Sequence, residues 1–502
     1  MRSKNNADRL KNYIRGQWLE AQTEMYEDVP NPATNELLSR VPLSGKEDLN
    51  AAVHAAKDAF QSWSETPVIE RARVMFRFQH LLFQHQDELA RMITLENGKN
   101  LAEAQAELLR AIEMVEFAAG MPTLLMGDSL PNIAREVDSE NIRMPLGIVA
   151  GICPFNFPVM VPMWMYPIAI TAGNTFILKP SERTPMSSIR IAELLEQSGL
   201  PKGVFNIVHG AHDVVNGLLE HADVKAISFV GSQPVAEYVY KTGAAHGKRV
   251  QALAGAKNHH LVMPDSNLRR AAKTIASAAF GCAGERCMAA SVVVAVNDIA
   301  DELVHCLIEE SSALKIGNGL EQGIDLGPVI RSSHLQRVHD YIEKGLTQGA
   351  ALVRDGRQDV GEIEKGYFLG PTIFDHAHPE MEIIRDEIFA PVLSVSRVKD
   401  FEEGLQVISQ SRYGNGACIY TNSGRLAREF VQRVDAGMVG VNVGVPAPMG
   451  FFSFTGWKQS FYGDLHANGK DGIEFFTKKK TITSRWFDDG DLNIGSQKTF
   501  VK

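Results

Sequence analysis

The residues best suited to chemistry lie at positions 280–289, which read Phe-Gly-Cys-Ala-Gly-Glu-Arg-Cys-Met-Ala. In this stretch Cys287 directly follows Arg286, and two glycines precede them. A thiol beside a fixed cation can be held as thiolate, the form that attacks carbonyl carbons. The alternative is that Cys287 is a small buried apolar residue, as most unpaired cysteines are. The local sequence leaves both interpretations open, so the rest of the chain must decide.

The 502-residue chain has an ordinary globular composition, with 44% apolar and 22% charged residues. This length exceeds what one hydrophobic core organises, so two or three domains are expected. The net charge of -9 argues against a general nucleic-acid surface. The five cysteines lack the spacing of a disulfide framework or a zinc site, which favours a reducing compartment and predicts no metal site.

The sequence predicts neither a secretion signal nor a membrane span. Residues 1–10 are basic but contain no apolar core segment, so a polar N-terminus and a cytoplasmic location are expected. Residues 147–170 are the most apolar stretch, yet they contain Pro154, Pro158, Pro162 and Pro167. Four prolines there favour buried strands and turns over a membrane helix.

Two regions of alternating strands and helices must position the reactive stretch. In the first, apolar runs predict buried parallel strands at residues 147–152, 175–180, 204–208 and 226–231. Helical segments near 185–198, 214–221 and 233–243 separate them, which indicates a doubly wound α/β domain. Ligands of such domains bind beyond the carboxyl ends of the strands. Polar residues follow three of these runs: Asn156, Lys179 with Glu182, and Ser232.

The second alternating region extends from about residue 291 to 443. Its expected strands are 291–296, 351–353, 392–397, 416–420 and 440–443, with helices near 299–314, 333–348, 400–410 and 424–434. Ahead of both regions, helices are expected over 46–63 and from 69 almost to 119, with a break at 96–99 where Gly98 is typical of a C-cap. Residues 481–487 are expected to add to a partner's sheet, and Asp488 begins a polar tail.

The signal for a phosphate-bearing cofactor is weak when taken alone. No Gly-x-Gly-x-x-Gly motif occurs where an ordinary dinucleotide site would need it. Instead, Gly231 and Ser232 end an expected strand and begin a helix, whose first backbone amides can receive a phosphate. Turns of this kind are common, so they do not identify a cofactor.

Six motifs in register resemble the aldehyde dehydrogenase superfamily over about residues 12–484. They are Pro-Phe-Asn-Phe-Pro at 154–158, Lys-Pro-Ser-Glu at 179–182, Phe-Val-Gly-Ser at 229–232, Gly-Glu-Arg-Cys at 284–287, Glu-Ile-Phe-Ala-Pro-Val at 387–392 and Phe-Thr-Gly at 454–456. Within that superfamily, residues 255–259, 283–289, 444–449 and 465–470 resemble the CoA-acylating methylmalonate-semialdehyde dehydrogenase family.

The resemblance implies an α/β chain with the aldehyde dehydrogenase fold. A Rossmann-like NAD-binding domain would comprise residues 1–125 and 145–255, and an α/β catalytic domain would comprise 256–455. Residues 126–144 and 456–490 would form a small bridging oligomerisation element, followed by a polar tail at 491–502. Members of the family form dimers and tetramers, so a homotetramer built as a dimer of dimers is expected.

The resemblance also implies that NAD binds the first α/β domain. Its implied contacts are Lys179 and Glu182 at the adenosine ribose with Arg183 nearby, Ser232 at the pyrophosphate, Glu387 at the nicotinamide-side ribose, and Cys153, Phe155 and Ala254 around the cofactor. Glu182 independently favours NAD over NADP, because a carboxylate binds a ribose diol and repels a 2′-phosphate. The alternative for Lys179 and Glu182 is a surface ion pair.

The resemblance assigns the nucleophile to Cys287, and assigns the carbonyl-oxygen donors to the Asn156 side chain and the Cys287 backbone N–H. Oxidation would leave a thioester on Cys287. Hydrolytic members place a glutamate before a Gly-Gly-Lys motif, but alignment on residues 255–257 puts Leu253 there. Leucine cannot accept a proton, and a thiol needs less help from a base than water does. Coenzyme A is therefore the expected acyl acceptor.

The substrate is expected to carry a carboxylate, because the resemblance places Arg110 and Arg286 beside the substrate and two guanidiniums can clamp one carboxylate. The alternatives for Arg110 are a structural salt bridge or a stem packed on the core. For a 3-oxo acid, decarboxylation follows acylation. Methylmalonate semialdehyde would give propionyl-CoA, and malonate semialdehyde would give acetyl-CoA, in a pathway such as valine or inositol catabolism.

Two other functions are kept as alternatives. A hydrolytic NAD-dependent semialdehyde dehydrogenase is disfavoured by Leu253. A catalytically silent binding or structural protein on the same fold is disfavoured by the presence of Cys287, Asn156 and Glu387 together.

Overall fold

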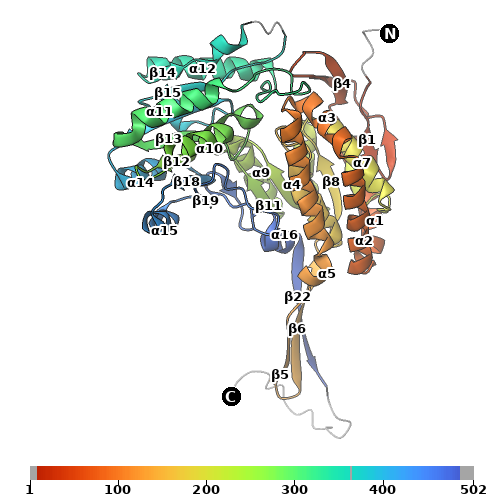
Figure 1. Cartoon of the computed structure of the whole chain (residues 1–502). Helices are drawn as coiled ribbons and strands as arrows, with labels where there is room; N and C mark the ends of the chain where they lie inside the picture. Colours follow the sequence, from red (N-terminus) through yellow and green to blue (C-terminus); the bar gives the residue numbers. More distant parts are fainter. Residues whose placement is uncertain (1–7, 362–364, 487–502) are drawn as a thin grey trace.

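The computed structural model describes residues 8–361 and 365–486, so Phe487 and the tail expected at 491–502 lie outside the described residues. Two large sheets with helices packed on them form the body, and a narrow three-stranded sheet projects away from it (Figure 1). Each large sheet buries one apolar cluster on each face. In the part of the chain that the structure describes, no helix is long and apolar enough to cross a membrane.

The first sheet has the strand order β2-β1-β9-β8-β7-β10-β11-β21. Its strands are β1 (Asn12–Ile14), β2 (Gln17–Leu19), β7 (Ile148–Ile152), β8 (Thr175–Lys179), β9 (Phe205–Ile207), β10 (Val224–Val230), β11 (Arg249–Leu253) and β21 (Phe461–Tyr462). The four strands expected here are β7 to β10, and they are parallel neighbours as predicted. β11 was missed because Gln251 interrupts its apolar pattern; that side chain is buried and accepts a hydrogen bond from Ser228 Oγ at 2.9 Å.

Helices cover both faces of this sheet. α1 (Lys46–Glu65), α8 (His212–Glu220) and α9 (Gln233–Ala245) pack on one face, and α6 (Met160–Thr171) packs on the other. On the same face, α7 (Met186–Gln197) packs against β1 and β9. The outer helices on this face are α2 (Val68–Gln84), α3 (Gln86–Asn97) and α4 (Leu101–Ala119), with the short α5 (Met121–Leu124) after α4. The helical pattern expected from 69 to 119 is thus three helices, and Gly98 ends α3 at a φ of 95°, the left-handed conformation predicted for a C-cap.

Helix α6 corrects one expectation, because residues 160–171 were expected to be strands and turns. Pro162 lies in the first turn, where its missing N–H costs nothing. Pro167 lies inside the helix, and its carbonyl accepts a hydrogen bond from Thr171 Oγ at 2.7 Å. Every residue from Val161 to Thr171 is buried. A helix buried on all sides has no amphipathic period, so its sequence did not show a helical pattern.

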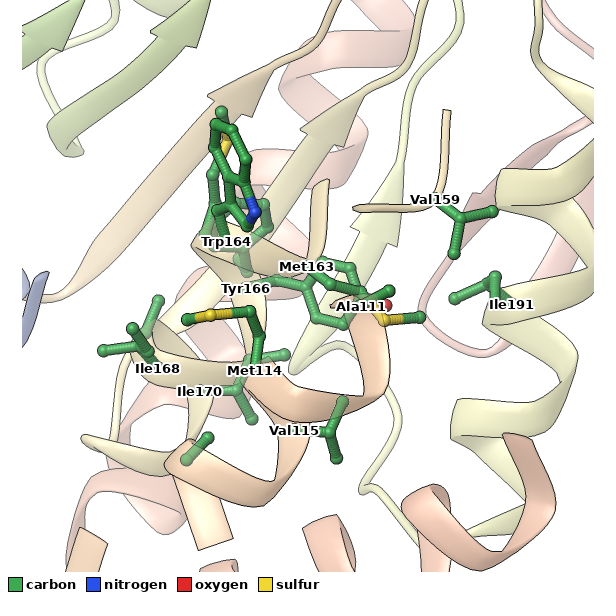
Figure 2. Close-up of a cluster of buried hydrophobic side chains, with 14 of the residues drawn as sticks. Ala111, Met114, Val115, Val159, Met163, Trp164, Tyr166, Ile168, Ile170 and Ile191 are labelled. Atoms are coloured by element: carbon green, nitrogen blue, oxygen red, sulfur yellow. The ribbon is translucent and has the colours of Figure 1, made fainter. Parts of the chain in front are cut away.

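A buried cluster joins α4 to α6 (Figure 2). Ala111, Met114 and Val115 come from α4, and Met163, Trp164 and Tyr166 come from α6. Buried aliphatic and aromatic side chains of this size each contribute about 1.5–3 kcal/mol relative to exposure. The cluster therefore fixes α4 against α6 and against the loop that joins β7 to α6.

The second sheet has the order β14-β15-β16-β13-β12-β18-β19 and is parallel except at β14. Its strands are β12 (Asn258–Val262), β13 (Ala290–Val296), β14 (Ala351–Arg354), β15 (Thr372–Asp375), β16 (Val392–Val398), β18 (Gly416–Tyr420) and β19 (Met438–Val441). One face is covered by α10 (Leu268–Phe280) and α11 (Asn297–Ser312), and the other by α12 (Ser332–Thr347), α13 (Glu382–Arg385), α14 (Phe401–Ser409) and α15 (Gly424–Arg433). The expected strands and helices are confirmed, whereas β12 and β15 were missed.

The projecting sheet is antiparallel and consists of β5 (Ser129–Ala134), β6 (Val137–Pro145) and β22 (Thr477–Arg485), in the order β22-β6-β5. β22 pairs along its whole length with β6 of the same chain, and it remains an outer strand of the sheet. Addition to a partner's sheet and assembly into a tetramer therefore stay predictions. The remaining elements are short: β3 (Tyr26–Pro30) with β4 (Leu37–Pro42), β17 (Tyr413–Gly414) with β20 (Trp457–Lys458), and α16 (Gly469–Phe475).

The core supports a paired stability prediction at two buried tyrosines. The Tyr166 hydroxyl has no hydrogen-bond partner among the described residues, whereas the Tyr420 hydroxyl donates to the Val443 carbonyl at 3.2 Å. An unsatisfied buried polar group costs about 1–3 kcal/mol, and a satisfied one contributes about 1 kcal/mol. Tyr166→Phe should leave the melting temperature unchanged or raise it, while Tyr420→Phe should lower it. Thermal unfolding measures both, and a lower melting temperature for Tyr166→Phe alone would contradict the assignment.

Candidate active site

A cavity of about 720 Å³ lies at the carboxyl ends of β7, β10 and β11, facing loops of the second sheet. This is where a doubly wound sheet is expected to bind its ligand. Of the twelve site residues expected from the sequence, six line the cavity: Phe155, Asn156, Ser232, Ala254, Cys287 and Glu387. The fold thus brings together residues that are up to 232 positions apart (387 minus 155).

A sharp turn between α10 and β13 presents Cys287 to the cavity. After Phe280 ends α10, Cys282, Ala283 and Gly284 adopt left-handed φ values of 50°, 54° and 68° in the 3₁₀ turn Gly281–Gly284. Position 284 requires glycine, because a Cβ there would lie 2.2 Å from the Ala390 carbonyl oxygen. Three consecutive residues in this conformation are costly, and such strain is characteristic of functional turns.

The Cys287 backbone is held rigidly, but its thiol is not preformed as a thiolate. The amide groups of Asn258 and Asn415 both donate to the Cys287 carbonyl, at 2.9 and 3.0 Å. Burial raises the pKa of the Cys287 thiol to about 12, and the Glu387 carboxylate acts in the same direction. Nearby backbone N–H groups and the Arg286 guanidinium lower this pKa, but they do not outweigh burial. The thiol is therefore protonated at neutral pH in this structure.

The Arg286 guanidinium lowers the pKa of the Cys287 thiol less than burial raises it, and it also pairs with an acidic residue on α4. Its Nη2 lies 3.0 Å from Glu103 Oε1, an oxygen that also accepts the Cys282 backbone N–H at 2.6 Å. Arg286 shares a narrow cavity of about 10 Å³ with Cys287 and Glu387. A thiolate held by the neighbouring cation, one of the two interpretations that the local sequence left open, is therefore not favoured by Arg286 alone in this state.

Arg110 is not among the residues that line the two cavities at Cys287. Arg110 lies on α4 with its side chain 48% exposed, and its Nη1 is 2.9 Å from Glu113 Oε2, three residues along the helix. It lines neither cavity. The local salt bridge considered from the sequence is thus the arrangement seen in the structure.

Asn156 is buried beside Cys287, and its amide is already oriented. Its Nδ2 donates to the Glu285 carbonyl at 2.9 Å. An amide nitrogen carries two hydrogens, so one donor remains for a ligand. The cavity that holds Asn156 and Cys287 can therefore place a hydrogen-bond donor and a sulfur nucleophile at one carbonyl group.

The residues expected at the adenosine ribose form a second group outside the 720 Å³ cavity lining. Lys179 Nζ lies 3.1 Å from Glu182 Oε2 and donates to the Gly210 carbonyl at 3.0 Å. Burial acts to raise the pKa of Glu182, but the Lys179 ammonium and hydrogen bonds to the carboxylate hold it below its usual value. Arg183 is adjacent and pairs with Glu27. With Lys179 only 5% exposed, this is a largely buried pair and not a surface ion pair.

Ser232 and Cys153, which were also expected to contact the cofactor, differ in whether their side chains line the cavity. Ser232 is the N-cap residue of α9, and its hydroxyl makes no capping hydrogen bond within the described structure. It therefore remains available at a helix N-terminus that faces the cavity. Cys153 donates its backbone N–H to the Lys179 carbonyl at 3.1 Å, while its thiol is buried beside Met165 and lies outside the cavity lining.

Glu387 and Lys257 are both buried, line the same narrow cavity and influence each other's pKa. Glu387 Oε1 accepts the Ala256 N–H at 3.0 Å, and burial raises the pKa of Glu387 to about 7. Lys257 Nζ donates to the Asp386 carbonyl at 2.7 Å, and burial lowers the pKa of Lys257 to about 7. Perturbed groups of this kind cluster at functional sites. Sequence reasoning singled out Glu387 but gave Lys257 no role.

Sequence reasoning also missed several cationic residues of the cavity. Arg331, Arg337 and Arg412 line it, together with the His334 ring. Their guanidiniums give the cavity a positive character suited to phosphate or carboxylate groups. No local motif identifies these arginines. Arg331 lies in the loop before α12, Arg337 lies in α12 and Arg412 lies before β17, so only the fold brings them together.

Comparison with known proteins establishes the class of this chain. Residues 18–482 match the model of the aldehyde dehydrogenase family, and the chain belongs to that family. It is an oxidoreductase with the α/β aldehyde dehydrogenase fold, as the sequence motifs predicted. Within the described residues, no group of three or more His, Cys, Asp or Glu side chains is placed to hold a metal ion.

Three named relatives are similar to this chain over almost its whole length. Malonate-semialdehyde dehydrogenase 1 of Geobacillus thermodenitrificans is 64% identical over 477 residues, covering 95% of this chain and 99% of that protein. The crystal structure of methylmalonate-semialdehyde dehydrogenase from Oceanimonas doudoroffii is 48% identical with a TM-score of 0.95, covering 96% of this chain and 99% of that one. A Sinorhizobium meliloti structure described as methylmalonate-semialdehyde dehydrogenase complexed with NAD is 44% identical, also with a TM-score of 0.95, over 96% of this chain and 99% of that one.

The buried thiol leads to a pH prediction. When a pKa lies well above the working pH, the thiolate fraction rises about tenfold per pH unit. Alkylation of Cys287 by iodoacetamide in the ligand-free enzyme should therefore accelerate about tenfold per unit from pH 7 to pH 9. Mass spectrometry of the modified peptide gives the rate, and Cys287→Ser provides the background from other cysteines. A rate that levels off below pH 8 would show that the thiolate forms near neutrality.

Proposed function

We propose that this protein is an NAD-dependent, CoA-acylating semialdehyde dehydrogenase. It would convert methylmalonate semialdehyde to propionyl-CoA and malonate semialdehyde to acetyl-CoA through a thioester on Cys287. One observation carries the proposal: Cys287 and Asn156 share a cavity, while the position of the hydrolytic base holds buried Leu253 at the end of β11. The names of the relatives support the choice of substrate.

The residues of the first sheet fit NAD. Ser232 at the start of α9 suits the pyrophosphate, and Glu182 held by Lys179 suits the adenosine ribose diol. Glu387 would contact the nicotinamide-side ribose, and Phe155 and Ala254, which also line the cavity, would contact the cofactor. Arg183 would lie near the adenosine ribose and Cys153 would contact the cofactor, although neither residue lines the cavity. NAD, when bound, supplies the hydride acceptor, and the S. meliloti relative was crystallised with it.

Acylation begins when the Cys287 thiol releases its proton to solvent water and the sulfur attacks the aldehyde carbon. Negative charge then develops on the carbonyl oxygen, where the Asn156 amide and the Cys287 N–H donate hydrogen bonds. Loss of one such donor typically costs about 2.7–4 kcal/mol of transition-state stabilisation. Departure of the aldehyde hydrogen as hydride converts the adduct to a thioester on Cys287.

Release of the acyl group decides between the acylating and hydrolytic reactions. A general base typically accelerates attack by water about 10²–10⁴-fold, and Leu253 supplies none. The thiol of coenzyme A reaches its nucleophilic form near neutrality far more readily than water does. Its attack on the thioester carbon would transfer the acyl group and return the Cys287 sulfur as the leaving group.

The substrate carboxylate would be bound by Arg286 and Arg110. Both guanidiniums already pair with acids of α4, Glu103 and Glu113, so the carboxylate must share or displace these partners. Once the thioester has formed, the carboxylate lies β to its carbonyl group. Loss of CO₂ then leaves a carbanion that the thioester carbonyl delocalises, and uptake of a proton from solvent at that carbon gives the propionyl or acetyl group.

The alternative is a hydrolytic NAD-dependent semialdehyde dehydrogenase, and one observation favours it. Glu387 is a buried carboxyl group with a pKa of about 7 in the same cavity as Cys287, which suits a general base. The requirement for coenzyme A distinguishes the two functions.

The decisive assay follows NADH formation from malonate semialdehyde with and without coenzyme A. With coenzyme A, turnover should be steady and the acyl-CoA product should accumulate. Without it, NADH should appear as a burst of about one equivalent per active site. Steady turnover at the same rate without coenzyme A would establish the hydrolytic function instead. Leu253→Glu should gain turnover without coenzyme A by supplying a base, and Leu253→Gln, of the same size, should not.

Carboxylate recognition predicts a difference between substrates. Arg110→Leu should raise KM about tenfold or more for malonate semialdehyde and leave KM for propanal unchanged, since a charge-assisted bond contributes about 1.5–3 kcal/mol. Glu113→Gln is the matched control, because it removes the resident salt bridge and keeps the guanidinium. Equal effects of Arg110→Leu on both substrates would show that Arg110 has a structural role only.

A further inference from the structure

The loop that carries Asn156 is anchored by a buried ion pair that the reaction scheme does not use. Lys99 follows the Gly98 turn between α3 and α4, and Glu107 lies two turns into α4. Lys99 Nζ lies 2.6 Å from Glu107 Oε2, and both side chains are 0% exposed. Sequence reasoning gave neither residue a role.

Both members of the pair also bind the backbone of the Asn156 loop. Lys99 Nζ donates to the Asn156 carbonyl oxygen at 2.7 Å. Glu107 Oε1 accepts the backbone N–H groups of Val159 and Met160, at 2.9 and 3.1 Å. The pair therefore holds the loop at the residue that carries the amide and again three residues later, where α6 begins.

Further contacts from the same turn complete the anchoring. Asn97 Nδ2 donates to the Phe155 carbonyl at 3.1 Å, and the Lys99 ammonium lies 4.0 Å from the centre of the Phe157 ring. Asn97 and Lys99 flank Gly98, whose left-handed φ of 95° turns the chain between them. One turn of the chain thus supplies contacts to three consecutive residues, Phe155, Asn156 and Phe157.

We propose that Lys99 and Glu107 are positioning residues that aim the Asn156 amide at the developing oxyanion. The inference rests on the proposed acylation at Cys287. The Asn156 side chain is fixed at one end by the Glu285 carbonyl and at the other by its own backbone. Without the Lys99 bond, the peptide group after Asn156 can rotate, and the free N–H of the amide moves with it. Oxyanion donors must lie within a few tenths of an ångström of their required positions.

A role in stability alone fits this pair less well. Burying two charges carries a desolvation penalty that can exceed their attraction, so replacing both by apolar residues is often neutral for stability. The pair does, however, fix backbone groups at defined distances, as a positioning device requires. The two roles therefore predict different behaviour when both charges are removed together.

The test uses Lys99→Met, Glu107→Gln and the double variant Lys99→Met/Glu107→Met. In each variant, the pre-steady-state burst of NADH from propanal without coenzyme A should slow about tenfold or more. Complete loss of an oxyanion donor typically slows the reaction about 10²–10³-fold, so the expected effect is a partial loss of that donor. KM for NAD should stay within about twofold, and the rate of Cys287 alkylation by iodoacetamide should not change, because alkylation develops no oxyanion. Lys241→Met removes an exposed Lys–Glu pair as the matched control.

Two comparisons separate positioning from stability and from the proposed function. The double variant should recover the melting temperature that Lys99→Met loses and should remain slow. Lys99→Met should cost little when added to Asn156→Ala, since both act on one donor. Additive effects, or a double variant that recovers the burst with its stability, would overturn the inference. If Asn156→Ala itself has a normal burst, the oxyanion assignment fails together with the inference, whereas a slow Asn156→Ala with a fast Lys99→Met refutes the inference alone.

Discussion

The loop between β7 and α6 is the part of this structure on which the site depends, and buried polar contacts hold it in place. Its backbone is bound by Lys99 and Glu107, while the apolar cluster between α4 and α6 fixes the helices that carry these contacts (Figure 2). Without the packing, the charges would be exposed to water and their hydrogen bonds would weaken. Without Lys99 and Glu107, the hydrogen bonds that fix the loop backbone against α4 would be missing. Packing and polar anchoring are therefore interdependent here.

Burial at Cys287 has two opposite effects on the proposed chemistry. It raises the thiol pKa to about 12, so less of the nucleophile is present at neutral pH. The same exclusion of water strengthens hydrogen bonds to a negatively charged oxygen in the transition state. The structure is thus better suited to stabilising the adduct than to storing a thiolate.

Arg286 is linked to the turn before Cys287 through its acidic partner, Glu103. Glu103 holds Arg286 and also binds the backbone of the strained turn before Cys287. A ligand carboxylate that binds Arg286 would therefore compete with Glu103 for the guanidinium, and Glu103 also holds the turn before Cys287. Burial also moves the pKa values of Glu387 and Lys257, which line the same narrow cavity as Arg286, to about 7.

The sequence alone determined the alternation of strands and helices, the family and the absence of a base at position 253, because these depend on residue identity and local period. It also predicted Cys287 as the nucleophile. It missed β11, β12 and helix α6, since Gln251, the paired histidines of β12 and burial on every side of α6 remove the usual patterns. Only the tertiary structure decided that Arg286 faces Glu103, that Arg110 faces Glu113 and that Lys99 binds the Asn156 loop. It also decided that the Cys287 thiol is protonated. Ionisation and ion pairing depend on desolvation and on neighbours distant in the chain, which a linear pattern does not record.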